Sequence, residues 1–232
     1  IELMARASLA ANEPQQAASL LAVLWRLRSA MANEPYRQVG MFAILAIHQT
    51  ATGILLDGLR LRSWNDQNLI DADRQLSALD FRHLSLLTTR WEVADVVDFI
   101  NRLGTDRSSA LREWSPYFAE YEYDLFPVLK WVLRLAPRGW LRQHQAFAAN
   151  EFLDRMLPPL RDSGLLAWHQ SEHNRLSDWR EGHGPPQIYS AMLGPSIRPN
   201  YSPLRILFAD TDTRLLRTAC ALERHSLRHQ QY

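Results

Sequence analysis

The clearest chemical pattern in the sequence is a pair of histidines with a glutamate between them. His169, Glu172 and His173 fit the string H-x-x-E-H, in which two histidines four residues apart lie on one face of a helix and can both ligate zinc. The glutamate could then activate a metal-bound water. A zinc site needs a third protein ligand, and the sequence identifies none. The string therefore predicts a metal-dependent hydrolase as the alternative to an ordinary surface helix.

A second group of residues points to binding rather than catalysis. Aromatic side chains concentrate between residues 114 and 140, and acids alternate with tyrosines over 120–124. Tyrosine and tryptophan give a large contact area at low entropic cost, which favours a groove that binds a protein partner. Core packing beside an exposed acidic face is the alternative. The residues expected to contact the partner are Trp114, Tyr117, Tyr121, Tyr123 and Trp131.

The remaining histidines of interest are expected to be structural. His48 lies on an apolar stripe, so we expect a buried side chain with a hydrogen-bond partner and a perturbed pKa. His225 and His229 lie near the end of the last predicted helix, where cations interact favourably with the helix dipole.

Composition excludes several other classes of protein. The 232 residues include 26 basic and 25 acidic side chains, so bulk charge attracts no phosphate backbone and we expect no nucleic-acid partner. One cysteine, Cys220, excludes an intramolecular disulfide. Nucleotide-binding loops and the G-x-S-x-G motif are absent, so no cofactor is expected. The longest apolar stretch, 41–61, is interrupted by charged residues, and we expect no membrane span within this chain.

Helical periodicity indicates the elements that position these groups. No proline occurs between Tyr36 and Ser115, and Asn12 is predicted to cap a helix that starts at Pro14. A long helix over about 36–62 is expected to bury one stripe: Met41, Ile44, Leu45, His48, Thr52, Leu55 and Leu59.

The last helix carries a second clear stripe. Its members are three or four residues apart, so we expect them to face the core while the arginines beside them face solvent. The stripe consists of Leu204, Phe208, Thr211, Leu215, Ala219 and Leu222.

No segment alternates with the period of a strand, so the sequence predicts an all-α protein in which antiparallel helical hairpins form an array or bundle. We expect a single domain over 1–232, with a possible subdivision into 1–104 and 116–232 and a loop between them. The Gly- and Pro-rich stretch 163–199 is predicted to be irregular, with short helices near 165–180 and 187–193, before the long last helix.

The end of the chain resembles a recurring group of bacterial helical proteins whose function is uncharacterised. Residues 221–232 read ALERHSLRHQQY, which is similar to their string A-L-E-x-Y-R-L-x-H-G-x-Y-P, although His225, Ser226 and Gln230 replace the usual Tyr, Arg and Gly. Residues 17–35 and 42–61 also resemble their helical pairs. The resemblance implies an extracytoplasmic helical domain that is anchored in the membrane through a segment preceding Ile1, and it transfers no catalytic residue.

Taken together, these features predict a helical binding or scaffolding module with a protein partner, rather than an enzyme. The metal-dependent hydrolase is the first alternative. A receptor for a small ligand, with an apolar pocket lined by tryptophans, is the second.

Overall fold

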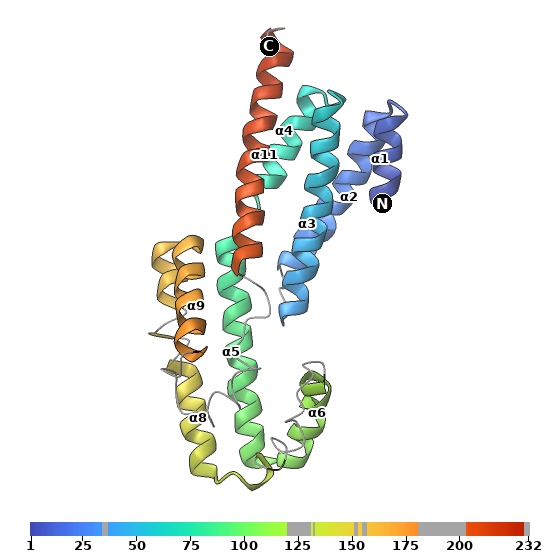
Figure 1. The fold of residues 1–232 in the computed structure, drawn as a ribbon. Coiled ribbons are helices and arrows are strands. Elements are labelled where there is room, and N and C mark those ends of the chain that lie inside the picture. The colour runs from blue at the N-terminus through green and yellow to red at the C-terminus, as the bar shows by residue number, and fades with distance from the viewer. Residues whose placement is uncertain are drawn as a thin grey trace. The chain divides into compact units, whose positions relative to one another are not determined.

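The computed structural model describes residues 1–33, 37–119, 131, 133–150, 153, 154, 157–180 and 203–229 (Figure 1). Within these ranges the elements are helices, and no strand occurs. The predicted all-α class is therefore confirmed, and the long last helix is present as α11, Pro203–His229. The arrangement in antiparallel hairpins stays a prediction.

The chain divides into two compact units. Unit 1 comprises Ile1–Leu84 and Tyr201–Tyr232, and unit 2 comprises Ser85–Asn200. The last helix thus belongs with the first helices, whereas the possible subdivision suggested by the sequence placed it with the middle of the chain. The loop expected between those parts is also absent, because residues 107–119 form helix α6.

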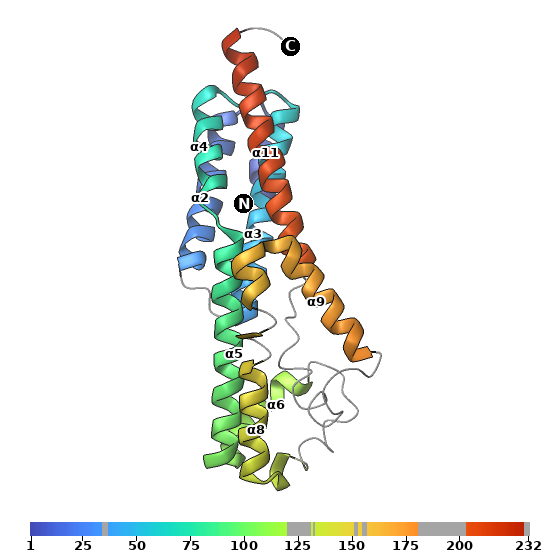
Figure 2. The same cartoon turned by 90° about the vertical axis from the view of Figure 1, so that its left-hand side faces the viewer.

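Unit 1 is built from α1 (Glu2–Ala10), α2 (Pro14–Asn33), α3 (Arg37–Arg60), α4 (Asp66–Ser77) and α11. Helix α3 packs against α1, α2 and α11, and α11 also packs along α4 (Figure 2). The stripe predicted for α3 is buried as expected from Met41 to Leu55, and Leu59 is partly buried. Burial of these side chains is the main favourable contribution to folding of the unit.

Two helices end in a turn that the sequence did not predict. Asn12 has φ 59° and Arg62 has φ 50°, in the left-handed region. In the first turn Glu13 N–H donates to Ser8 and Asn12 N–H donates to Leu9, which is the Schellman pattern. Asn12 therefore ends α1 rather than capping α2, and that prediction is wrong. Asparagine tolerates left-handed backbone better than most residues.

Arginines and aspartates join α4 to α11 at the surface. Arg217 Nε lies 2.7 Å from Asp73, and Arg224 and Arg228 each lie 2.8 Å from Asp66. The hydrogen bonds from Arg228 and Arg224 lower the pKa of the Asp66 carboxyl. The first aspartate of α4 pairs with the later arginines of α11, and the second aspartate pairs with the earlier one, so the two helices run antiparallel.

The stripe predicted to bury α11 faces solvent instead. Phe208, Leu215 and Leu222 are 57%, 63% and 66% exposed, and the opposite face of the helix is buried. That buried face carries smaller side chains together with two larger ones: Ile206, Ala209, Thr213, Leu216 and Cys220. The prediction is wrong because α11 has two apolar faces, and periodicity alone does not show which one meets the core.

Unit 2 contains most of α5 (Phe81–Thr105), α6 (Arg107–Ala119), α8 (Arg138–Asn150), the π-helical turn η2 (Pro159–Ser163) and α9 (Leu165–Arg180). The short helix predicted near 165–180 is confirmed by α9, whereas the one near 187–193 lies outside the described residues. The core cluster of this unit draws on α5, α6, α8 and residues 133–136: Val96, Phe99, Ile100, Leu103, Ala110, Leu111, Leu133, Ala136 and Leu141.

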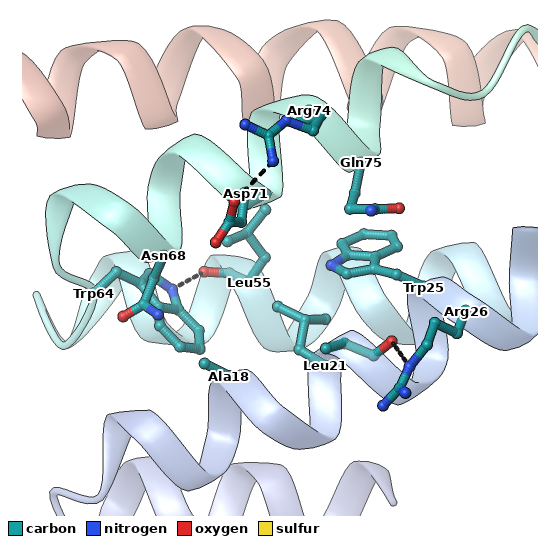
Figure 3. A pocket seen from close by; sticks show the side chains of 12 residues that line it. Ala18, Leu21, Trp25, Arg26, Leu55, Trp64, Asn68, Asp71, Arg74 and Gln75 are labelled. Atoms are coloured by element: carbon teal, nitrogen blue, oxygen red, sulfur yellow. Dashed lines mark hydrogen bonds and ion pairs between the residues drawn. The ribbon is translucent and has the colours of Figure 1, made fainter.

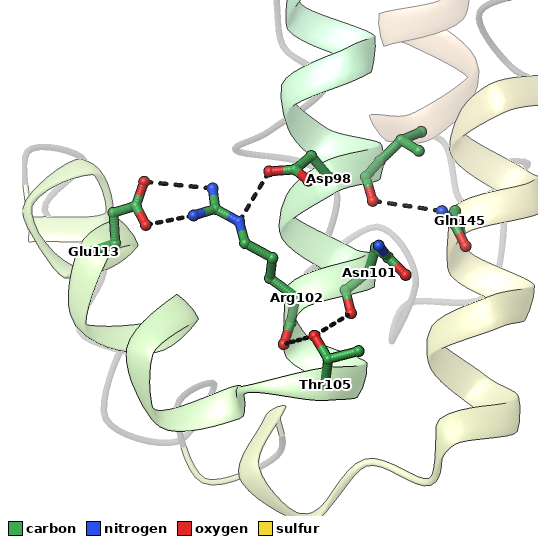
Figure 4. Close-up of polar contacts among 7 residues, drawn as sticks. Asp98, Asn101, Arg102, Thr105, Glu113 and Gln145 are labelled. Carbon is green, nitrogen blue, oxygen red and sulfur yellow. Dashed lines mark hydrogen bonds and ion pairs between the residues drawn. The ribbon is translucent and has the colours of Figure 1, made fainter.

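Polar contacts explain why α6 is a helix and not the expected loop. Asp106 Oδ1 accepts the Ser109 N–H at 3.2 Å, which satisfies a free donor at the start of α6. Arg102 of α5 lies between Asp98 and Glu113 and pairs with both (Figure 4). The polar composition of 105–115 therefore reflects a helix cap and an exposed helix face.

One helix in the described part of the chain, Gly40–Arg60 within α3, is long and apolar enough to cross a membrane by length and composition, with a mean hydropathy of 1.4. Of that window 44% is buried inside the structure, and the same length and composition occur in helices that do not cross a membrane. The expectation that no segment spans a membrane stays a prediction.

Trp64 closes the turn between α3 and α4 by packing on a glycine of α3. Its indole Nε1–H donates to the Leu55 carbonyl at 2.9 Å, and the ring lies where a Cβ on Gly58 would be. We expect Gly58→Ala to displace the indole and to lower the free energy of unfolding by about 1–3 kcal/mol, measured by urea denaturation.

Gly104→Ala is the matched control, because Gly104 also lies in a helix but has no atom within 4 Å of a Cβ built there. This variant should be unchanged or more stable by up to about 1 kcal/mol, since alanine favours a helix. Equal effects of the two substitutions would contradict the packing of Trp64 on Gly58.

Candidate functional site

The predicted aromatic surface is described at only one of its side chains. Trp131 is 62% exposed, and the guanidinium of Arg134 lies 5.9 Å from the centre of its ring. Leu135, four residues later, is 75% exposed. Trp114 and Tyr117 lie on α6, where the structure describes the backbone. Tyr121 and Tyr123 lie outside the described residues. The aromatic groove stays a prediction.

The possible metal ligands all lie on α9, as the H-x-x-E-H string requires. His169 is partly buried, whereas the side chains of Glu172 and His173 are outside the described set. Among the side chains that are described, no group of three or more histidine, cysteine or acidic residues could hold a metal ion. The hydrolase alternative therefore gains no support and stays a prediction.

A cavity that the sequence did not locate opens between α2, α3 and α4, with a volume of about 390 Å³ (Figure 3). Trp64 and Trp25 lie at its two ends, and Leu21 and Leu55 line the space between them. We call this space the tryptophan cavity. Sequence reasoning missed it because both tryptophans have the pattern of ordinary core residues, and each is at least 96% buried.

Polar side chains surround the mouth of the tryptophan cavity. Asp71 pairs with Arg74 at 3.3 Å and accepts a hydrogen bond from Gln67. Arg26 donates through Nε to the Ala22 carbonyl, and its terminal nitrogens have no hydrogen bond to the part of the chain that the structure describes. Gln75 lies against the Trp25 indole (Figure 3). A cavity with apolar walls and a few polar groups at the mouth is the usual form of a small-molecule site.

The core of unit 1 contains a chain of polar side chains beside this cavity. Arg28 is 1% exposed; its Nη2 donates to the Gln75 carbonyl at 2.6 Å, and its Nη1 lies 3.1 Å from His48 Nδ1. On its other side His48 Nε2 lies 2.9 Å from Thr213 Oγ1, and that hydroxyl donates to the Ala209 carbonyl. The chain therefore connects α2, α3, α4 and α11.

The direction of these hydrogen bonds fixes the protonation of His48. A guanidinium only donates, so His48 Nδ1 accepts and the ring proton is on Nε2. Burial, and then the charge of Arg28, lower the pKa of His48 to about 3. Burial also lowers the pKa of Arg28 to about 10, so it remains a cation at neutral pH. The expected buried histidine with a partner is confirmed.

The outer face of α11 exposes four large apolar side chains along one helix, namely Leu204, Phe208, Leu215 and Leu222. Phe208, Leu215 and Leu222 are spaced by seven residues. This is the spacing of a seam through which one helix packs along another. His225 and His229 lie beyond it, with ring centres 4.3 Å apart.

No family model, curated protein or solved structure matches this chain. The resemblance of residues 221–232 to bacterial helical proteins therefore stays an expectation, and function is argued from the sites alone.

The polar chain predicts that acid weakens unit 1. Between pH 6.5 and 3 the unfolded His48 binds a proton that the folded one does not, so stability falls as pH falls, by at most about 1.4 kcal/mol per pH unit. We expect His48→Gln to reduce this slope, because its amide can accept from Arg28 and donate to Thr213 without titrating. Urea denaturation at a series of pH values from 7 to 4 measures this dependence of stability on pH.

The comparison between parent and variant isolates His48, because His144, whose pKa burial also lowers, is present in both. His48→Phe is a second variant, which removes both hydrogen bonds and should lower stability by about 1–3 kcal/mol even at pH 7. Identical pH slopes in parent and His48→Gln would mean that His48 is not buried as a neutral ring.

Proposed function

We propose that this protein is a helical binding or scaffolding module, and that a protein partner packs along the outer face of α11. The observation that carries the proposal is the exposure of three large apolar side chains at seven-residue spacing on one straight helix, namely Phe208, Leu215 and Leu222. Together with Leu204 they leave on the order of 400 Å² of apolar surface in water, which is the size of the largest apolar patch on a typical monomer, and such patches are often functional.

The other face of the same helix strengthens the argument. At the core, α11 buries Ile206 and Leu216 together with the polar Thr213 and the small Ala209 and Cys220, while larger leucine and phenylalanine side chains also face out. A helix that needed only one packing face would gain more by burying the larger side chains. The outward leucines are therefore explained by a second packing surface.

The exposure of Trp131 and Leu135 supports a similar role for the predicted aromatic surface of unit 2. Both are large apolar residues one helical turn apart, and Tyr and Trp are enriched where proteins bind each other. The predicted contacts at Trp114, Tyr117, Tyr121 and Tyr123 belong to this proposal as well.

The test is site-specific photo-crosslinking in the source cells, from a photoreactive residue at Thr218, beside Leu215 and Leu222. We expect a crosslinked product of discrete size that Leu215→Glu with Leu222→Glu reduces at least tenfold, because two carboxylates in an apolar seam must be desolvated. Both leucines are exposed, so the variant should keep its circular dichroism and its thermal midpoint.

Ala221→Glu is the control, since Ala221 is exposed on α11 but about 100° around the helix from Leu222. It should retain the crosslinked product. The proposal fails if no discrete product forms, or if the product persists when both leucines are replaced.

A second function, as a receptor for a small ligand, is favoured by the tryptophan cavity. Its volume of about 390 Å³ lies within the range of small-molecule sites, and its two indoles give it apolar ends. This matches the alternative in which tryptophans line a pocket. It is compatible with a protein partner, because α11 does not line the cavity.

A further inference from the structure

We infer that the tryptophan cavity selects an amphipathic carboxylate, that is, a slender apolar body with an anionic end, such as a medium-chain fatty acid or an aryl-alkanoic acid. The inference rests on the proposed receptor function and goes further by assigning the charge and shape of the ligand. The arguments are the length of the cavity, the chemistry of its walls and the balance of donors and acceptors at its mouth.

The length of the cavity follows from the residues that line it on two helices. On α2 the lining runs from Ala18 to Arg26, and on α4 it runs from Asn68 to Gln75. From first to last residue these stretches rise by eight and seven steps, which at 1.5 Å per residue gives about 12 Å and about 10 Å. With Trp64 near one end and Trp25 near the other, the space fits an extended chain or a flat ring system rather than a compact polar molecule (Figure 3).

The walls between the two indoles are apolar. Leu21 of α2 and Leu55 of α3 contribute side chains, and Ala72 of α4 is buried against the same core. The indole N–H of Trp64 is already bonded to the Leu55 carbonyl and offers the cavity only ring carbon. A ligand therefore gains by removing its apolar body from water and finds no polar partner inside.

The charged groups at the mouth favour an anion. The lining contains two arginines, Arg26 and Arg74, and one aspartate, Asp71, so its net charge is 2 − 1 = +1. Asp71 already accepts hydrogen bonds from Arg74 and Gln67. An ammonium group at this position would meet the ion pair between Arg74 and Asp71 and the guanidinium of Arg26.

The hydrogen-bonding groups left over at the mouth are mostly donors. Asn68 lies beside Trp64, at the end of the cavity away from Trp25 and Gln75, and its carbonyl oxygen is used in the capping box with Asn65. Arg26 keeps both terminal nitrogens, and Arg74 uses only Nη1 among the described residues. Gln75 can donate as well. Carboxylate oxygens only accept, so a carboxylate complements this set, whereas an alcohol uses it in part.

The experiment compares three probes of equal chain length, octanoate, octanol and octylamine, below their micellar concentrations. The purified full chain is titrated with each by isothermal calorimetry. We expect octanoate to bind at least threefold more tightly than octanol, which is the scale of an exposed charge pair, and octylamine to bind most weakly.

Two variants assign the effect to the site. Arg26→Gln with Arg74→Gln should bring octanoate to the affinity of octanol and leave octanol unchanged. Arg205→Gln removes an exposed arginine from α11, away from the lining, and should change nothing. Ala22→Trp places a bulky side chain at the mouth and should abolish binding of all three probes, while its thermal midpoint reports that it folds.

The outcomes separate the two levels of the proposal. If octylamine binds as well as octanoate, or if the preference for octanoate survives in Arg26→Gln with Arg74→Gln, the carboxylate inference is wrong and the receptor function stands. If none of the probes binds at millimolar concentration, or if Ala22→Trp binds like the parent, the receptor function fails and the inference with it.

Discussion

Burial of α3 is the constraint on which unit 1 depends. This helix carries an almost continuous apolar stripe, and α1, α2 and α11 all pack against it. A helix that is apolar on several sides must be covered on several sides, because exposing it would return that surface to water. The other elements of the unit are placed relative to α3. Trp64 packs on the last turns of α3, and surface ion pairs hold α4 beside α11.

The same constraint explains why a cation lies in the core. Arg28 is surrounded by helices that pack on α3, and its charge is balanced by two acceptors and by the Trp25 ring at 4.6 Å rather than by a described carboxylate. Such an arrangement is tolerated when the hydrogen bonds are well directed, and it restricts how the helices can slide. His48 must stay neutral to accept from Arg28, so packing and protonation are linked at one ring.

The sequence alone predicted the structure correctly where its pattern supported one interpretation. Helix α3 is covered on several sides, so the residues of the predicted stripe from Met41 to Leu55 are buried, His48 among them, and Ala51 and Ile54 beside the stripe are buried as well. The sequence did not predict the structure where its pattern supported two interpretations equally well. On α11 both faces are apolar, and Asn12 is equally suited to begin a helix or to end one. The stretch 105–115 looks like a loop by composition, although the Asp106 side chain caps a helix there. The tryptophan cavity depends on how three helices diverge, which no local pattern encodes.

Unit 1 is discontinuous in the chain, since α11 returns to it after more than a hundred residues assigned to unit 2. The hydrogen bond between His48 and Thr213 joins residues 165 apart. During synthesis on the ribosome the first four helices must therefore wait, with one side of α3 uncovered, until the last helix emerges. Closing so long a loop is entropically slow. That interval is when a nascent chain is most exposed to aggregation and most in need of a chaperone.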